Sequence, residues 1–230
     1  MKFLFPIVIL IISGQIVFTQ TDSLFVAKTS DFEISGKGDN PNWQKTEWVQ
    51  LLAKDAQNEK RLTSSKILYS ETGIYFLFYC EDKTITSTYT ADYSDLYEED
   101  VIEIFLWTSE DYPFYFEYEL SPHNYELPIF VPNVEGDFFG WKPWHYEGDR
   151  KTRHATFIEN TKDGVKGWSG EFFIPYALLK PLANVPPSSG TTWRANMYRI
   201  DYDKGPSAWT WQPVTTNFHE YMSFGSFVFE

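Results

Sequence analysis

Two kinds of side chain in this sequence could contact a polar, ring-shaped ligand: aromatic rings, and carboxylates placed within apolar strands. The chain has nine Trp, fifteen Tyr and twenty Phe, so that aromatic residues make up 19% of its 230 positions. A core of this size needs fewer rings, and we expect some of them at the surface. There they can stack on the apolar C–H face of a sugar ring.

Glu103 is the carboxylate with the most unusual neighbours. It shares one face of a predicted strand with Val101 and Phe105. A carboxylate among apolar side chains costs free energy unless it has a partner. We therefore expect Glu103 either to contact a ligand or to form a structural ion pair, for which Arg199 and Arg194 are the candidate cations.

Two tryptophans near the C-terminus form the clearest aromatic pair. Trp209 and Trp211 alternate along one predicted strand, so their rings face the same side. We expect ligand contact from Trp211 first and from Trp209 second. The remaining strand tryptophans are expected to pack in the core or at its edge: Trp43, Trp48, Trp168 and Trp193.

A second pair of carboxylates raises the alternative of a glycoside hydrolase. Such an enzyme needs two carboxylates about 5 to 10 Å apart across a cleft. Glu117 and Glu119 share one strand face with Tyr115 and could lie that close. Alternating Glu on an antiparallel strand is usually solvated, and no acid–base motif accompanies the pair, so we assign no catalytic residue.

The sequence gives weak signals for metals and reactive groups. No Asp-x-Asp-x-Asp-Gly calcium loop is present. We expect Cys80, the single cysteine, to be a small buried hydrophobe without a function. We expect His219 to make a structural hydrogen bond, because no second His lies near it in sequence. The oxygen ligands that a structural calcium could use are Asp92, Asp95, Glu98, Glu99 and Asp100.

The elements that would position these residues are strands. Two β-rich runs, 66–70 and 74–81, flank Glu71-Thr72-Gly73 and predict a hairpin. One segment, Pro175 to Lys180, predicts a short helix with Pro in the first turn. The other predicted strands, which bring the total to about ten, are 100–107, 113–121, 125–131, 154–160, 167–174, 192–201, 208–214 and 223–230.

This order of elements predicts an all-β fold. Many short strands separated by turns, with one helix, favour an antiparallel two-sheet β-sandwich of the jelly-roll or immunoglobulin-like kind. Two long segments, 82–99 and 132–153, exceed what tight hairpins need. Loops of that kind are where a binding site is expected on a rigid scaffold.

The N-terminal segment, the length and the net charge of the chain predict its domain organisation and its class of partner. Residues 1–20 hold Lys2 and then a short apolar run, which predicts a cleaved signal peptide and an exported protein without membrane insertion. Residues 21–230 are predicted to form one domain. The formal net charge of −13 repels phosphate backbones, so we exclude nucleic acid as a partner. The oligomeric state stays open.

Six pieces in a fixed order resemble carbohydrate-binding module family 9, which is related to the DOMON-like β-sandwiches. They are I-S-G-K-G-D-N-P-N-W-Q-K-T (34–46), Y-E-E-D-V-I-E-I-F-L (97–106), F-Y-F-E-Y-E-L-S-P (114–122), G-W-S-G-E-F-F-I-P-Y-A-L-L (167–179), W-R-A-N-M-Y-R-I-D (193–201), and the closing T-W-Q-P (210–213) with N-F-H-E-Y-M-S-F-G-S-F-V-F-E (217–230). No single piece is specific, but their order is.

The resemblance implies non-catalytic binding of a mono-, oligo- or polysaccharide in support of glycan catabolism. Family members hold a sugar between two aromatic rings, which implies Tyr97 and Trp211 as the walls here and Glu103 as a hydroxyl acceptor. Polar contacts would come from Asn196 and Arg199. Gln212 and Trp209 complete the implied ligand-binding set. No cofactor is required, although the resemblance leaves a structural calcium open.

The DOMON relationship supplies a third alternative, a haem-binding domain. Some related sandwiches bind haem through a Met and a His or Lys. This chain has Met197 and Met222 together with four His, but no C-x-x-C-H motif. The sequence therefore favours sugar binding over both haem binding and glycoside hydrolysis.

Overall fold

The computed structural model describes residues 21–55 and 61–230. Over these residues the chain forms fourteen strands and one short α-helix. The predicted signal peptide lies outside the described residues. Among the helices in the described ranges, none is long and apolar enough to cross a membrane.

The strands follow one another with few helical interruptions. They are β1 (Ser23–Lys28), β2 (Val49–Ala53), β3 (Thr63–Tyr69), β4 (Gly73–Glu81), β5 (Val101–Trp107), β6 (Phe114–Leu120), β7 (Glu126–Val134), β8 (Asp137–Phe138), β9 (Lys142–Pro143), β10 (Arg153–Thr161), β11 (Gly164–Pro175), β12 (Thr192–Asp201), β13 (Ser207–Thr210) and β14 (Gly225–Phe229). The helical elements are α1 (Tyr176–Leu179) and the 3-10 turns η1 (Pro41–Lys45), η2 (Leu96–Glu98), η3 (Gly148–Arg150) and η4 (Tyr221–Ser223).

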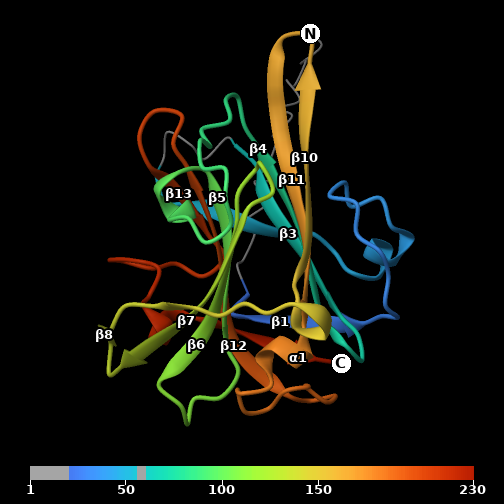
Figure 1. The fold of residues 1–230 in the computed structure, drawn as a ribbon, viewed down its shortest axis with the longest axis vertical. Coiled ribbons are helices and arrows are strands. Elements are labelled where there is room, and N and C mark those ends of the chain that lie inside the picture. Colours follow the sequence, from blue (N-terminus) through green and yellow to red (C-terminus); the bar gives the residue numbers. More distant parts are fainter. Residues whose placement is uncertain (1–20, 56–60) are drawn as a thin grey trace, which may run out of the picture.

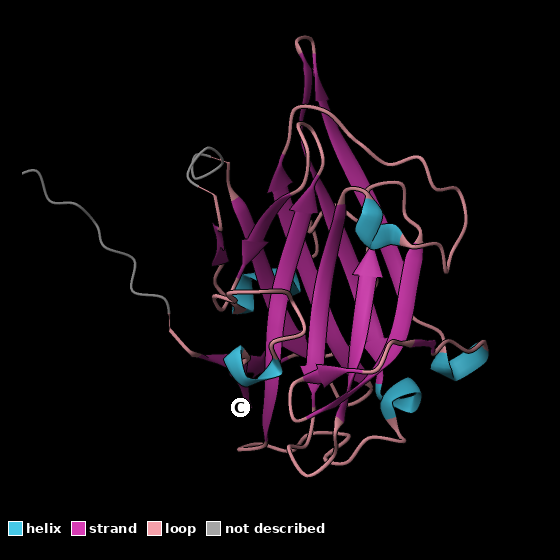
Figure 2. Cartoon of the chain, turned by 90° about the vertical axis from the view of Figure 1, so that its left-hand side faces the viewer, coloured by secondary structure: helices cyan, strands magenta, loops and turns pink. Residues whose placement is uncertain are grey.

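The strands form two facing layers (Figures 1 and 2). The first sheet has the order β10-β11-β4-β3, and the second has the order β14-β12-β5-β6-β7. β1 pairs in parallel with both β14 and β3, and β2 pairs with both β13 and β3, so these two strands join the layers. All other strand pairings of the described residues in the two layers are antiparallel, as in the β4–β11 and β5–β6 ladders.

Apolar side chains from both sheets fill the space between the layers. Phe76 on β4 stacks on Phe172 of β11 with ring centroids 5.2 Å apart, and Phe172 lies 4.6 Å from the Tyr118 ring of the second sheet. Because side chains alternate along a strand, the same strands also have an outer face. β5 is buried at every position, which means that its outer face is covered as well.

A buried carboxylate anchors the segment that precedes β2. Glu171 of β11 is fully buried and accepts hydrogen bonds from the backbone N–H groups of Ser35 and Gly36 at 2.9 and 2.8 Å, and from Trp43 Nε1 at 2.8 Å. Gly36 has a φ of +82°, and an added Cβ would lie 2.8 Å from the Thr156 backbone. The G-K-G-D-N-P-N-W motif therefore wraps around one acceptor.

The predicted all-β sandwich with one short helix is confirmed. The hairpin around residues 71–73 is present as β3 and β4, and α1 falls within the predicted helix. β1 and β2 were not predicted, because their short, half-exposed sequences carry little alternation. The predicted strand 208–214 ends at Thr210. Trp48, expected in the core or at its edge, is 46% exposed and therefore lies outside the core. Cys80 is buried, and burial raises the pKa of its thiol to about 12.

Removal of the Glu171 carboxylate should loosen residues 35–43. Glu171→Ala removes the acceptor of four N–H donors, those of Ser35, Gly36, Gly38 and Trp43, which should lower the free energy of unfolding by roughly 2–5 kcal/mol in urea titrations. Glu33→Ala is the matched control, because that side chain is 92% exposed. Equal stability of the two variants would contradict the anchoring role.

Candidate functional site

Three glutamates gather on the outer face of the second sheet. Glu103 on β5 lies opposite Glu119 on β6, and Phe105 lies opposite Glu117 in the same ladder. Residues two apart on one strand share a face, so Glu117 and Glu119 point the same way. We call Glu103, Glu117 and Glu119 the glutamate trio.

The glutamate trio is buried without adequate hydrogen-bond partners. The three residues are 2%, 4% and 0% exposed in chain order. Both carboxyl oxygens of Glu119 and one oxygen of Glu117 are buried and accept no hydrogen bond in the described structure. Unpaired buried carboxyl oxygens carry a desolvation penalty that native proteins usually avoid, so this face is the candidate site.

Burial shifts the protonation of the glutamate trio. It raises the pKa of Glu103 to about 8. The pKa values of Glu117 and Glu119 are raised well above their usual range, first by burial and then by the neighbouring glutamates. At neutral pH these carboxyl groups can therefore donate as well as accept hydrogen bonds.

Aromatic side chains and one histidine surround the trio. His219 lies 4.0 Å from the Glu117 carboxyl and 2.6 Å from the Tyr115 hydroxyl. Burial lowers the pKa of His219 to about 4, so its ring is neutral at pH 7. The exposed ring of Phe138 on β8 stacks on His219 at 4.2 Å. The expected structural hydrogen bond of His219 is therefore present.

The next strand and the C-terminal loop continue this aromatic surround. Tyr198 on β12 pairs with Glu103. Its ring stacks on Phe218 at 4.0 Å with an interplanar angle of 10°, and its hydroxyl donates to the Phe218 carbonyl at 2.9 Å. Phe218 is partly exposed. The loop that carries Phe218 is thereby held over the trio.

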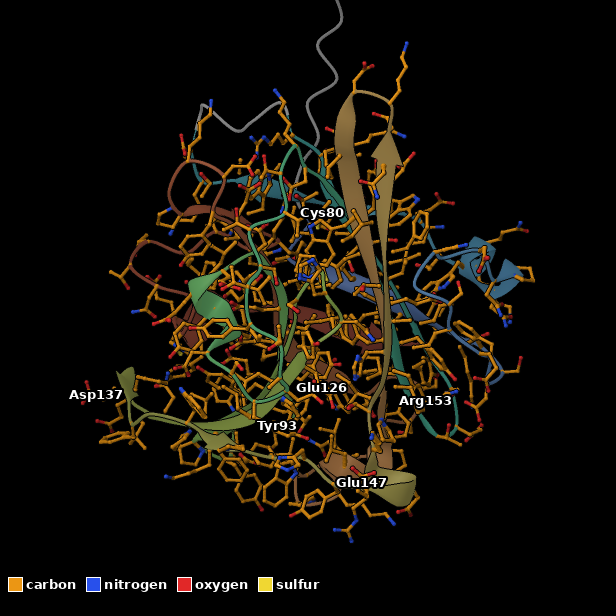
Figure 3. All side chains as sticks on the ribbon, turned by 45° about the horizontal axis from the view of Figure 1, so that its top comes forward. Cys80, Tyr93, Glu126, Asp137, Glu147 and Arg153 are labelled. Atoms are coloured by element: carbon orange, nitrogen blue, oxygen red, sulfur yellow. The ribbon has the colours of Figure 1, made fainter. Side chains whose placement is uncertain are left out.

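Tyr97 lies at the rim of this face. It belongs to η2, which directly precedes β5, and its side chain remains 37% exposed. The Tyr202 hydroxyl donates to its backbone carbonyl at 3.0 Å. The same loop is tied to β7 through Tyr93, whose N–H donates to the Glu126 carbonyl at 2.9 Å; Figure 3 labels both residues. A neighbouring β-strand thus fixes the loop that presents Tyr97.

The expectation that Trp209 and Trp211 contact a ligand is wrong. Their side chains are 0% and 1% exposed and belong to the core between the sheets. The Trp211 ring lies 5.4 Å from the Phe227 ring and packs over Gly225, where an added Cβ would lie 2.5 Å from it. The two rings do face one side, but that side is the interior.

The predicted polar contacts of Asn196 and Gln212 are occupied within the protein. The Asn196 amide receives the Gln212 N–H at 2.8 Å and donates to the Gln212 carbonyl at 3.0 Å. The Gln212 amide donates to the Thr21 carbonyl. The Asn196 side chain therefore holds the T-W-Q-P segment against β12, and the Gln212 amide nitrogen is bound to the segment that precedes β1.

Arg199 is also a structural residue. Its side chain is fully buried on the core side of β12, with Nη2 at 2.9 Å from Asp82 and 2.7 Å from Asp201. Its guanidinium lies 4.5 Å from the Trp209 ring. The expected ion pair with Glu103 is absent, because the two side chains emerge on opposite faces of the sheet. Arg194 binds the Phe224 carbonyl and leaves Glu103 unpaired.

The acidic loop suggested for calcium is engaged in bracing hydrogen bonds. Asp100 accepts backbone N–H groups from Thr86 at 2.6 Å and Tyr202 at 2.8 Å. Glu99 accepts from Thr88. Within residues 21–55 and 61–230, the grouping with metal-like geometry is instead Asp82, Asp201 and Asp203.

Two guanidinium groups already neutralise that aspartate grouping. Arg61 lies 2.6 Å from Asp201 and 2.9 Å from Asp203, and Arg199 contacts Asp82 and Asp201 from the other side. Guanidinium groups neutralise and hydrogen-bond carboxylates in place of a metal ion. These residues form an ion-pair network that is a poor fit for a resident metal.

The pair Met197 and His219 does not fit the haem alternative. Met197 is buried between the sheets, whereas Met222 is 70% exposed. His219 lies on the outer face with Tyr115. A Met and a His on opposite faces of one sheet cannot ligate the same iron.

Sequence reasoning missed much of the outer-face site. Glu117 and Glu119 were predicted to be solvated, and this prediction is wrong, because loops cover them. Tyr198 and Phe218 were not singled out. The pattern E-x-E on one strand and E on the preceding strand was the available signal, but it needed the β5–β6 register to place three carboxyls together.

Comparisons with known proteins agree with this architecture. Residues 34–127 match the family model described as carbohydrate family 9 binding domain-like. A search of curated protein sequences found no match. Among solved structures, the chain is similar to a protein from Bacteroides uniformis ATCC 8492 thought to bind carbohydrate, with a TM-score of 0.73, 17% identity, and 90% of this chain and 99% of that chain covered.

Two further structures come from Caldicellulosiruptor kristjanssonii. Each is a carbohydrate-binding module of family 9, one in complex with cellotriose and the other in complex with glucose. The TM-scores are 0.66 and 0.64, each at 16% identity, with 90% of this chain covered and 93% and 95% of those chains. At such identity the likeness establishes a shared fold.

Truncation of Trp211 should act on stability. Trp211→Ala removes a buried ring from the core and should lower the free energy of unfolding by about 3–5 kcal/mol in chemical denaturation. Trp48→Ala, at a half-exposed ring, is the control and should cost far less. A Trp211→Ala protein as stable as this control would contradict the core assignment.

The glutamate trio should make stability fall as pH rises. Glu103 is ionised above pH 4.5 in the unfolded chain but only above about 8 in the folded one, so its contribution is complete below pH 4.5 and is lost toward pH 8. Between pH 6.5 and 8 the melting temperature should drop, by about 2–4 °C per kcal/mol lost. Scanning calorimetry at a series of pH values measures the melting temperature.

Glu103→Gln should flatten this slope, whereas Glu47→Gln, at an exposed position, should keep it. The opposing contribution of His219 is lost only as pH falls from 6.5 toward 4, below the measured window. A wild-type melting temperature that rises across the window would contradict the assignment.

Proposed function

We propose that this chain, a β-sandwich similar to carbohydrate-binding module family 9, is a non-catalytic sugar-binding module whose ligand reaches the glutamate trio. The match over residues 34–127 and the fold shared with the two Caldicellulosiruptor kristjanssonii modules support carbohydrate as the ligand class. The position of the site rests on the residues of this chain.

The observation that carries the proposal is the set of unpaired oxygens on Glu119 and Glu117. A pyranose presents several hydroxyls that each donate and accept one hydrogen bond. Carboxyl groups at a fixed spacing can bind neighbouring hydroxyls strongly. Sugar binding would therefore relieve the desolvation penalty that the free protein carries at this face.

Tyr97 and Phe218 are the proposed aromatic walls. Tyr97 is exposed beside the trio, and Phe218 lies on the opposite border, where one face of its ring is occupied by Tyr198. Rings of this kind supply contact area at low entropic cost. Glu103 on β5 is the carboxyl group that we propose to hydrogen-bond a sugar hydroxyl. Phe218 thus takes the place that Trp211 was expected to fill.

The setting of this module is proposed from its sequence and its fold class. We propose export, a role in glycan catabolism, and binding that needs no cofactor. Each has a direct check: N-terminal sequencing of the secreted protein, growth on glycans after deletion, and sugar titration in the presence of EDTA. Release of reducing sugar from a polysaccharide by the purified protein would instead establish the hydrolase alternative.

Calorimetric titration with mono- and disaccharides tests the binding. The wild type should bind sugar without releasing product, and Tyr97→Ala should weaken binding roughly 3- to 10-fold, since one aromatic contact contributes about 0.5–1.5 kcal/mol. Tyr112→Ala, an exposed Tyr near the far end of β5, is the control and should bind like wild type. Equal affinity of both variants would remove Tyr97 from the site.

A further inference from the structure

Three aspartates and two arginines meet where the two sheets approach each other. Asp82 follows β4 and Arg61 lies just before β3, both in the first sheet. Arg199 and Asp201 belong to β12 of the second sheet, and Asp203 lies beyond the end of that strand. The ion pairs among these five residues therefore connect the two layers.

The three aspartates have the spacing of a cation site. One oxygen from each of Asp82, Asp201 and Asp203 lies within 4.8 Å of the others. Oxygen ligands on opposite sides of a calcium ion are about 5 Å apart, because each Ca–O bond measures about 2.4 Å. In this protein the Arg61 guanidinium bridges two of the acids instead, with Nη1 at 2.6 Å from Asp201 and Nη2 at 2.9 Å from Asp203.

The two arginines differ in how they are held. Arg199 is fully buried, donates to the Glu81 carbonyl at 2.8 Å and lies 4.5 Å from the Trp209 ring. The Arg61 side chain is 18% exposed and lines an open pocket of about 810 Å³, which the three aspartates also line. Trp209 Nε1 donates to the backbone carbonyl of Arg61 at 3.2 Å. The Arg61 side chain could therefore be removed while its backbone stays anchored.

The aspartates keep an unused ligand atom and an excess of negative charge. Oδ1 of Asp203 is buried and has no hydrogen-bond partner in the described structure, and the side chain is 7% exposed. Three carboxylates and two guanidinium groups leave one net negative charge. Loss of the Arg61 side chain would leave two, which is the charge that a divalent cation neutralises.

We infer that Arg61 takes the place of a structural divalent cation in this protein. It neutralises Asp201 and Asp203, links the two sheets and makes the folded state independent of calcium. The three aspartates thereby form a latent calcium site that the Arg61 side chain blocks. Water in the pocket could complete the about six to eight oxygen ligands that calcium takes. The inference does not depend on sugar binding, so its failure would leave the proposed function standing.

Melting temperatures in EDTA and in about 10 mM CaCl₂ test the inference. The wild type should melt within about 1 °C in the two buffers, because calcium finds no open site. Arg61→Ala should melt about 5–10 °C lower in EDTA, since it leaves carboxylates without their cation. Calcium should return about 3 °C or more of that loss, as expected for a Kd of about 0.1–1 mM. NaCl at the same ionic strength should not.

Further variants separate a metal site from a general effect of charge. Arg61→Lys keeps a positive charge between the acids and should gain nothing from calcium, and neither should Arg61→Ala combined with Asp203→Asn. Arg150→Ala, at an exposed arginine of η3, is the matched control and should melt like the wild type in both buffers. Arg61→Gln serves the same purpose if Arg61→Ala does not fold.

Three results would overturn the inference. The first is a wild-type melting temperature that falls in EDTA. The second is an Arg61→Ala protein that calcium stabilises no more than sodium does. The third is a calcium gain that persists when Asp203→Asn is added, because the cation would then be bound elsewhere.

Discussion

The outer face of the second sheet is organised by one constraint: three carboxyl groups lie buried under loops, with no Lys or Arg beside them among the described residues. Glu103, Glu117 and Glu119 arise from ordinary strand alternation on β5 and β6, so the pairing register brings them together. The surrounding positions are aromatic or aliphatic, and loops before β5 and after β13 must cover them. Burial of the apolar neighbours therefore forces burial of the acids, which raises their pKa values.

Elsewhere the same protein compensates its buried charges. Glu171 receives donors from the backbone of the segment that it anchors, and Arg199 is clamped between Asp82 and Asp201. These two groups organise the first sheet and the junction between layers. The glutamate trio differs from these groups, because oxygens of Glu117 and Glu119 have no hydrogen-bond partner among the described residues.

The sequence predicted the fold more completely than it predicted the residues of the candidate site. Strand alternation and turn residues predicted the sandwich, and the segment after Tyr97 identified Glu103 as a carboxylate in apolar surroundings. The pair Trp209 and Trp211 was misassigned, because alternation shows that two rings share a side but not which side faces the interior. Glu117 and Glu119 were placed in solvent for a related reason: the loops that cover them come from distant parts of the chain, and local pattern does not report that cover.

In the proposed function, carbohydrate recognition follows from the unpaired carboxyl oxygens of Glu117 and Glu119, and the aromatic rings align the sugar. A crystal structure with the tightest-binding sugar tests this claim most directly. The account predicts ligand polar atoms within hydrogen-bond distance, about 3 Å, of Glu103 and Glu119, with the sugar ring against Tyr97. A sugar bound at another surface, with the Glu119 oxygens still unpaired, would contradict it.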